Sequence, residues 1–246
     1  MKYLFFIVTL LLFSCGQQIA ETEAKLSFST KTFSSKRCID DNCAKVEVSY
    51  PVAENSPAAD PINEDLMEQM LLYFNNEKGL DNLDSAASNF LDSYEEFKND
   101  FPEAPGEWSI ELEVELSYES DSTLSFKFSE FNYSGGAHPN SSVYYMNFDK
   151  QSGEYLSVDR LLLDEKKLLG IAEKAFRKHH EVEEGKSLGD AGFFLPETGF
   201  FLPNAMGYEG DKFVMIYIPY EIGPYVMGYT ELEFELKDLE GVVRQR

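Results

Sequence analysis

The sequence has few positive charges, few histidines and cysteines, and no long apolar run beyond its N-terminus. Its 21 Lys and Arg residues face 44 Asp and Glu residues, which gives a formal net charge of −23. A surface this acidic repels phosphate groups, so the charge excludes nucleic acid and favours a cationic partner, although solubility alone also explains acidity of this kind. Neither a P-loop nor a His-Glu-x-x-His or Gly-x-Gly-x-x-Gly motif occurs. We therefore expect no cofactor, no metal site and no catalytic activity.

Residues 1–14 have the features of a signal peptide. Lys2 precedes an apolar run that ends at Phe13, well below the ~20 residues needed to span a bilayer. Leu12-Phe-Ser-Cys15 has the form of a bacterial lipobox, so we predict lipid attachment at Cys15; the alternative is an ordinary secretory signal with an incidental cysteine. Residues 15–25 would then be a polar tether. The protein would be anchored by lipid to the bacterial cell envelope, with the outer membrane expected and the periplasmic or surface side left open.

The two other cysteines, Cys38 and Cys43, form an even pair once Cys15 carries lipid. An exported protein meets an oxidising compartment, so we predict a disulfide that closes a hairpin. A metal site is a poor alternative, because further ligands are not close in the sequence. A catalytic thiol pair is poorer still, because the spacing is not Cys-x-x-Cys.

Hydrophobic periodicity predicts an α+β fold of antiparallel sheets, each packed by one or two helices, in two related subdomains of residues 26–130 and 131–246. The expected strands are residues 26–30, 44–50 (ended by Pro51), 108–117, 124–129, 143–148, 156–158, 212–218 and 229–236, with two brief strands in the Phe-Phe-Leu-Pro repeat of 193–203. The expected helices run from Pro61 to Gly79, from an Asp81 cap to Pro102, and from Asp164. The hairpin of 108–129 is expected to keep one face in water. Its row of Glu111, Glu113 and Glu115 is expected to be a solvated face rather than a metal site.

A glycine-rich loop at residues 133–140 joins two of the expected strands. Gly135 and Gly136 permit positive φ, and Pro139 forces His138 toward an extended conformation. A Ser/His/acid set can be drawn from Ser134 or Ser141 with His138 and Asp149, but closeness in sequence does not establish that geometry. We interpret His138 first as a residue that shapes the loop, with a recognition role left open.

Three motifs carry a family resemblance: Tyr133-x-Gly-Gly-Ala-His-Pro139, the Phe-Asp-x-x-x-Gly turn of residues 148–153, and Pro219-Tyr-Glu-Ile-Gly-Pro-Tyr-Val-Met-Gly228. They resemble the extracytoplasmic domain of the anti-sigma factor RsiV. Residues of about 25 to 130 are similar in pattern to a domain that usually precedes it and that also occurs at the N-terminus of the peptidoglycan deacetylase PdaC. The resemblance implies a binding or sensing module, in a family largely of unknown function, and no reaction. RsiV senses lysozyme, which is a cationic protein. The resemblance therefore implies lysozyme or another cationic envelope protein as a partner.

The two loops at residues 133–140 and 219–228 are the predicted ligand site. Its candidate residues are Tyr133, Gly135, Gly136, His138, Pro139, Tyr220, Glu221 and Tyr225. The alternative is that these loops only complete the fold. RsiV-type signalling is not expected, because neither a membrane-spanning helix nor a sigma-binding segment is recognisable. A cell-wall glycan ligand or a structural envelope role is the second hypothesis, and a hydrolase is the third.

Overall fold

The computed structural model describes residues 25–74, 79–104, 106–136 and 138–245. A five-stranded sheet has the order β1-β2-β3-β4-β5, and a three-stranded sheet has the order β6-β7-β8. The strands are β1 (Ser27–Ile39), β2 (Asn42–Glu54), β3 (Trp108–Glu119), β4 (Thr123–Tyr133), β5 (Asn140–Asp149), β6 (Ala205–Glu209), β7 (Lys212–Tyr217) and β8 (Thr230–Glu235). The helices are α1 (Ala59–Leu72), α2 (Leu83–Asp100), α3 (Val158–Leu161) and α4 (Glu165–His179), with 3-10 turns η1 (Tyr225–Met227) and η2 (Leu236–Leu239). The α+β class is confirmed, whereas the predicted signal peptide, Cys15 and the tether up to residue 24 lie outside the described residues.

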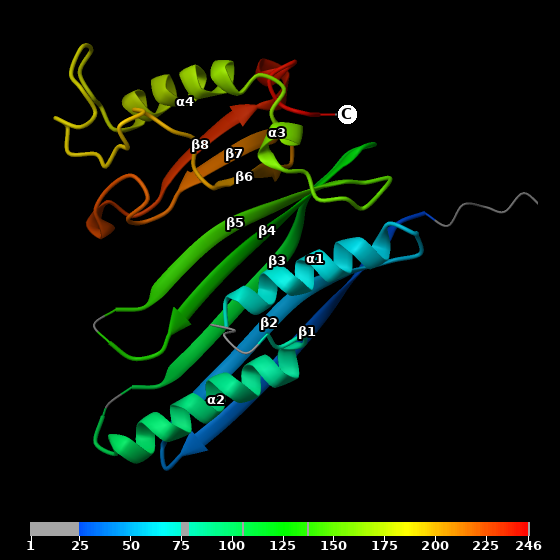
Figure 1. Ribbon diagram of the computed structural model, residues 1–246, viewed down its shortest axis with the longest axis vertical. Coiled ribbons are helices and arrows are strands. Elements are labelled where there is room, and N and C mark those ends of the chain that lie inside the picture. Colours follow the sequence, from blue (N-terminus) through cyan, green and yellow to red (C-terminus); the bar gives the residue numbers. More distant parts are fainter. Residues whose placement is uncertain (1–24, 75–78, 105, 137, 246) are drawn as a thin grey trace, which may run out of the picture.

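Helices α1 and α2 lie along one face of the five-stranded sheet (Figure 1). Buried side chains from both helices, such as Ile62 and Tyr94, share a core with alternate residues of β2, β3 and β4. The helices also connect β2 to β3, and these two strands pair in parallel from Ala44 opposite Trp108 to Ser49 opposite Glu113. The expectation of purely antiparallel sheets is therefore wrong at this pair, because a connection long enough to hold two helices lets the chain return in the same direction.

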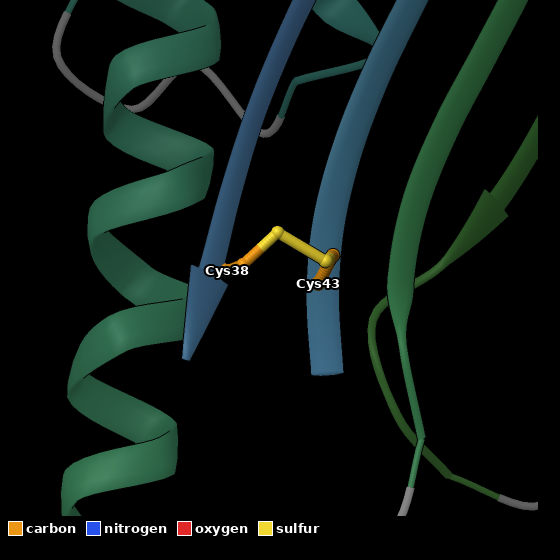
Figure 2. The surroundings of a disulfide bond; sticks show 2 residues. All are labelled: Cys38 and Cys43. Carbon is orange, nitrogen blue, oxygen red and sulfur yellow. A yellow bond between two sulfur atoms is a disulfide. The ribbon is translucent and has the colours of Figure 1, made fainter. Parts of the chain in front are cut away.

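The β1–β2 hairpin is closed by the predicted disulfide between Cys38 and Cys43, whose Cα atoms are 4.0 Å apart. Figure 2 shows the bond joining the two strands near their turn, beside α2. Both strands are longer than predicted, and Pro51 lies inside β2 opposite Thr30 rather than at its end. Proline is tolerated there because the pairing of β2 with β3 has already stopped at Ser49, so β2 has a partner on one side only.

The helix ends also differ from the expectation. Helix α1 ends at Leu72 instead of reaching Gly79, and Tyr73 closes it with backbone bonds to the last turn. Helix α2 is capped by Asn82 rather than Asp81, because the Asn82 side chain accepts a hydrogen bond of 2.9 Å from the backbone N–H of Ser85. The Asp164 cap of α4 is confirmed by a bond of 2.9 Å from the N–H of Lys167. Within the described ranges, no helix combines the length and apolar character that crossing a bilayer requires.

In the second half, β7 and β8 lie where strands were predicted, but two other expectations are wrong. Residues 156–158 do not form a strand, since Val158 begins the short helix α3. The Phe-Phe-Leu-Pro repeat of residues 193–203 is irregular apart from its predicted turn, in which the Gly199 N–H donates to the Pro196 carbonyl at 3.0 Å. Strand β6 was missed. The sheets divide the described chain after β5, while the predicted boundary at residue 130 falls inside β4.

The second sheet packs against the face of the first sheet that the helices leave free. On its side away from β7, the backbone of β6 is bonded by side chains of the first sheet. Ser125 accepts from the Tyr208 N–H at 3.1 Å, and Asn147 donates to the Met206 carbonyl at 3.0 Å. Ser125 and Asn147 are themselves joined by a hydrogen bond of 2.8 Å, and both are buried. The prediction that the β3–β4 hairpin keeps one face in water is therefore wrong at the Ser125 end of β4.

Candidate functional site

The predicted loop between β4 and β5 is shaped by internal contacts. The Tyr133 hydroxyl donates to the Gly136 carbonyl at 3.1 Å. Gly135 has a positive φ of 90°, a conformation that favours glycine, and a Cβ built there would make an ordinary contact of 3.4 Å with Nε1 of Trp108. Nδ1 of His138 donates to the Pro139 carbonyl at 3.0 Å, which places the ring proton on that nitrogen. Tyr133, Gly135, Gly136 and Pro139 thus position the loop and, through it, the His138 ring.

The second predicted loop follows β7. Glu221 folds it: its Oε2 accepts from the Ile218 N–H at 3.0 Å, and its Oε1 accepts from the Asn204 backbone and side chain at 2.9 Å each. Tyr220 has a positive φ of 72°, which is rare for a side chain of this size. The residue is 61% exposed. Glu221 is therefore a structural residue of the loop, whereas Tyr220 points a large ring toward solvent.

The two loops meet through their aromatic rings. The His138 and Tyr225 rings stack with centroids 4.6 Å apart and an interplanar angle of 24°. Tyr220 lies next to Tyr225, with ring centroids 5.6 Å apart. Tyr225 is 40% exposed and Tyr229 is 41% exposed. We call His138, Tyr220, Tyr225 and Tyr229 the aromatic patch; the fold brings three predicted site residues together there.

Tyr229 and Phe131 were missed by sequence reasoning. Partial burial raises the pKa of the Tyr229 hydroxyl and the Glu130 charge adds to that rise, while a hydrogen bond with Ser141 opposes it. Ser141 is paired with Phe131 across β4 and β5, which places this exposed phenylalanine beside the patch. Tyr229 is the first residue of the strand predicted for residues 229–236, and it was therefore assigned to that strand and not to the site. No sequence signal separated either ring from the core aromatics.

An acidic trough adjoins the patch on the open face of the first sheet. A cavity of about 540 Å³ is lined there by residues of β1 to β4 that include Glu47, Glu111, Glu113 and Phe131. Lys45 pairs with Glu111 at 2.7 Å and with Glu47 at 3.4 Å, and no ion pair is recorded for Glu113 among the described residues. Phe131 belongs to the trough and neighbours the aromatic patch, so the two surfaces are continuous.

Glu130 is the buried acid of this region, with 7% of its surface exposed. Burial raises the pKa of its carboxyl group, although the Ser142 hydroxyl, which donates at 2.9 Å, acts in the opposite direction. The carboxyl group is thus partly desolvated and hydrogen-bonded. A raised carboxyl pKa in a structural hydrogen-bond pair does not by itself assign chemistry.

The Ser/His/acid set considered from the sequence is not assembled in the structure. Asp149 lies at the opposite end of β5 from His138, where its Oδ2 accepts from Arg244 at 2.6 Å. The Ser/His/acid set drawn from the sequence is therefore wrong, because an extended strand separates its members by roughly 3.4 Å per residue. No group of three or more His, Cys, Asp or Glu residues able to hold a metal is found in the described part of the chain.

One Gly-x-Ser-x-Gly stretch, Gly185 to Gly189, was overlooked in the sequence. It lies in a loop after α4 and not between a strand and a helix, as the nucleophile elbow of a hydrolase requires. The Ser187 hydroxyl accepts from the Asp190 N–H at 3.0 Å and so shapes a turn. This stretch gives no support to a serine nucleophile.

Two family models match the chain in succession. The family described as deacetylase PdaC matches residues 38–141, and the family described as protein of unknown function DUF3298 matches residues 161–237. Two consecutive parts of the chain are therefore each similar to a different family. These matches agree with the PdaC-like part of the resemblance, and the second family assigns no activity. A comparison with curated proteins gave no match.

Solved structures share the fold over nearly the whole described chain. A DUF3298 family member from Bacteroides fragilis NCTC 9343 is 16% identical with a TM-score of 0.70, covering 91% of this chain and 95% of its own. A DUF3298 family protein from Pseudomonas aeruginosa PAO1 is 21% identical with a TM-score of 0.64, covering 89% of this chain and 95% of its own. At these identities the likeness establishes the fold alone.

Proposed function

We propose that this chain is a lipid-anchored binding module of the bacterial cell envelope, whose ligand surface is the aromatic patch. The observation that carries the proposal is the stack of His138 on Tyr225, which joins two distant loops at an exposed position. Tyrosine rings supply large contact areas at low entropic cost and are frequent anchors in protein interfaces. The proposal assigns recognition to the patch and no catalytic step to any residue.

A cationic envelope protein fits this surface best. The chain has a formal net charge of −23, and the acidic trough with Glu47, Glu111 and Glu113 continues from the patch. Opposite charge steers a cationic partner toward the patch, where the tyrosine rings supply short-range contacts. The resemblance to RsiV supports lysozyme as one concrete partner.

Cell-wall glycan is the second candidate. Tyr220 is 61% exposed and its ring lies beside that of Tyr225, so the pair offers aromatic surface to a ligand. Sugar rings present apolar faces that stack on aromatic side chains, and such contacts do not need the charge of the trough. This candidate therefore predicts binding that depends on Tyr220 and hardly on salt.

Calorimetric titration of the full chain with a cationic lysozyme tests the first candidate. Tyr225→Ala is the test variant, and Leu163→Ala is a matched control, because Leu163 is 62% exposed and bonds to Val242, near Arg244 and the Asp149 end of β5 that lies opposite His138. We expect saturable one-to-one binding that persists at raised salt and weakens at least tenfold in Tyr225→Ala alone. Heat that disappears with salt, or that an unrelated basic protein reproduces, would mean charge attraction only and would refute the proposal.

Sedimentation with purified peptidoglycan separates the two candidates. Glycan binding that Tyr220→Ala abolishes, without any titration signal for lysozyme, would favour the second candidate. Absence of both signals would leave the aromatic patch with a role in folding alone and would end both proposals.

A further inference from the structure

The two sheets end in four edge strands: β1, β5, β6 and β8. An edge exposes unpaired N–H and C=O groups, and proteins protect such edges with charges or covering segments. Three of these edges are protected: β1 carries Lys31, Lys36 and Arg37, β8 carries Glu231, Glu233 and Glu235, and β6 is bonded by the side chains of Ser125 and Asn147. Strand β5 differs from all three.

Only one half of the β5 edge is covered. The Asp149 N–H donates to the Glu154 carbonyl at 2.9 Å, and the Asn147 carbonyl accepts from the Leu156 N–H at 2.7 Å. Backbone groups of an antiparallel strand alternate between its two sides, so those of residues 141, 143 and 145 face this same open side. Among the described residues no backbone partner is found for them, and β5 contains no Lys, Arg or Pro.

Space for a further chain adjoins the open half. A cavity of about 480 Å³ begins beside Tyr144 and Tyr145 of β5, continues along Asn147 and Leu156 of the covered half, and is also lined by residues 200–204. Residues 200–203 thus line the same cavity as this part of β5, and among the described residues no backbone hydrogen bond joins them to β5. A strand that paired with β5 would find room there for its side chains.

We propose that the open half of β5 receives an extended cationic segment of a partner protein, which pairs as a sixth strand through residues 141, 143 and 145. Donors and acceptors repeated at every second residue match the backbone of an extended chain. A second copy of this protein would bring another charge of −23 to the edge, so a cationic segment is favoured over self-pairing. This inference deepens the proposed binding function and rests on it, because the open half of β5 begins at Ser141, three residues after His138 of the aromatic patch.

Hydrogen exchange resolved by NMR tests the pairing on the full chain. The probe is a short peptide in which lysine alternates with valine and threonine, and its control is the same peptide with N-methylated backbone amides. The amides of residues 141, 143 and 145 should gain at least tenfold protection on binding of the probe. Those of residues 142 and 144, which already face β4, should not change, and the methylated peptide should give no protection.

A pair of variants at Ser141 tests the same edge chemistry. Ser141→Pro removes an outward N–H without removing a bond to β4, and Ser141→Ala removes the hydroxyl but keeps that N–H. We expect probe binding to weaken about tenfold in the proline variant and to persist in the alanine variant. Equal loss in both variants would overturn the pairing.

The failures of the two proposals are distinguishable. Lysozyme binding that needs Tyr225, with unchanged exchange at residues 141, 143 and 145 in the presence of the peptide, would overturn strand addition and leave the proposed function intact. Protection of these amides that rises with protein concentration in the absence of peptide would show self-pairing of β5 and would overturn the cationic partner.

Discussion

Two clusters lie where the halves of the molecule meet: a polar junction between the sheets and the aromatic patch. They differ in how many of their groups already have a partner within the protein. At the junction between the sheets, Ser125, Asn147 and the β6 backbone are buried and bonded to one another. In the aromatic patch, Tyr220, Tyr225 and Tyr229 keep 40% or more of their surface exposed. A bonded, buried cluster holds a fold together, whereas exposed rings can still gain contacts from a ligand. The comparison therefore assigns stability to the junction and recognition to the patch.

Gly207→Ala should break the junction with the largest effect. A Cβ at Gly207 would lie 2.4 Å from Cδ1 of Tyr145 and 2.7 Å from the Ser125 hydroxyl, so the sheets would have to move apart. Overpacking of this kind costs about 1–3 kcal/mol or more of the free energy of unfolding. Urea denaturation measures the loss.

Gly170→Ala is the matched control for that change. Gly170 lies inside α4, and a Cβ there would meet nothing within 4 Å. Alanine favours a helix interior over glycine by roughly 0.5–1 kcal/mol, so this variant should be stabilised. Equal free energies of unfolding for Gly207→Ala and Gly170→Ala would mean that the close packing at Gly207 does not contribute to stability.

Asn147→Ala should have the next largest effect. It removes the donor to the Met206 carbonyl and the partner of Ser125, leaving buried polar groups unpaired. We expect about 1–3 kcal/mol of destabilisation by denaturation, against a negligible change for Asn140→Ala at the exposed start of β5. A neutral Asn147→Ala variant would show that solvent replaces these bonds.

Acidification should weaken the junction through Glu209. Burial acts to raise the pKa of Glu209, but hydrogen bonds from Lys127 and Tyr145 outweigh it and hold the pKa below the ordinary value. A lowered carboxyl pKa stabilises the fold above the unfolded-state pKa, and that stability is lost as pH falls through the folded-state pKa. Glu209→Gln should flatten this part of the stability curve, by less than about 1 kcal/mol because the side chain is partly exposed. If the free energy of unfolding depended on pH in the same way in Glu209→Gln and in the unchanged protein, this role of Glu209 would be contradicted.

Tyr225→Ala should change stability least of all. Its ring contacts are exposed, so we expect a shift within about 0.5 kcal/mol, although ligand binding is lost. Thermal melting measures the first quantity and titration the second. A loss of stability as large as that of Asn147→Ala would erase the distinction between patch and junction.

Local patterns predicted the fold where the chain itself shows a period. The strict alternation from Trp108 to Ser117 located β3, because one of its faces is buried and the other carries glutamates. Strand β6 was missed because Ala205 to Tyr208 are buried on both faces and the strand contains a glycine. The Phe-Phe-Leu-Pro repeat was assigned to strands because its residues favour them, yet it has no pairing partner. The pattern of one strand does not show which strand it pairs with or in which direction, so the parallel pairing of β2 with β3 was not predicted.

The candidate site was predicted in its parts and not in its geometry. The unusual residues of both loops marked His138, Tyr220 and Tyr225, and the family resemblance pointed to the same loops. Their stacking depends on how the second sheet packs on the first, which no local pattern states. The structural role of Glu221 likewise became visible only from its hydrogen bonds, whereas the positive φ of Gly135 was predicted.

The capping of β6 by the first sheet also sets an order of events during synthesis. Tyr208 bonds to a serine 83 residues earlier and Met206 to an asparagine 59 residues earlier, so both partners have left the ribosome well before β6 does. The earlier sheet can thus serve as a template on which the later one docks. A fragment of residues 150–246 made alone should expose that edge and self-associate in light scattering, and addition of the preceding fragment should suppress the association. The first half of the chain would then act as a built-in chaperone for the second.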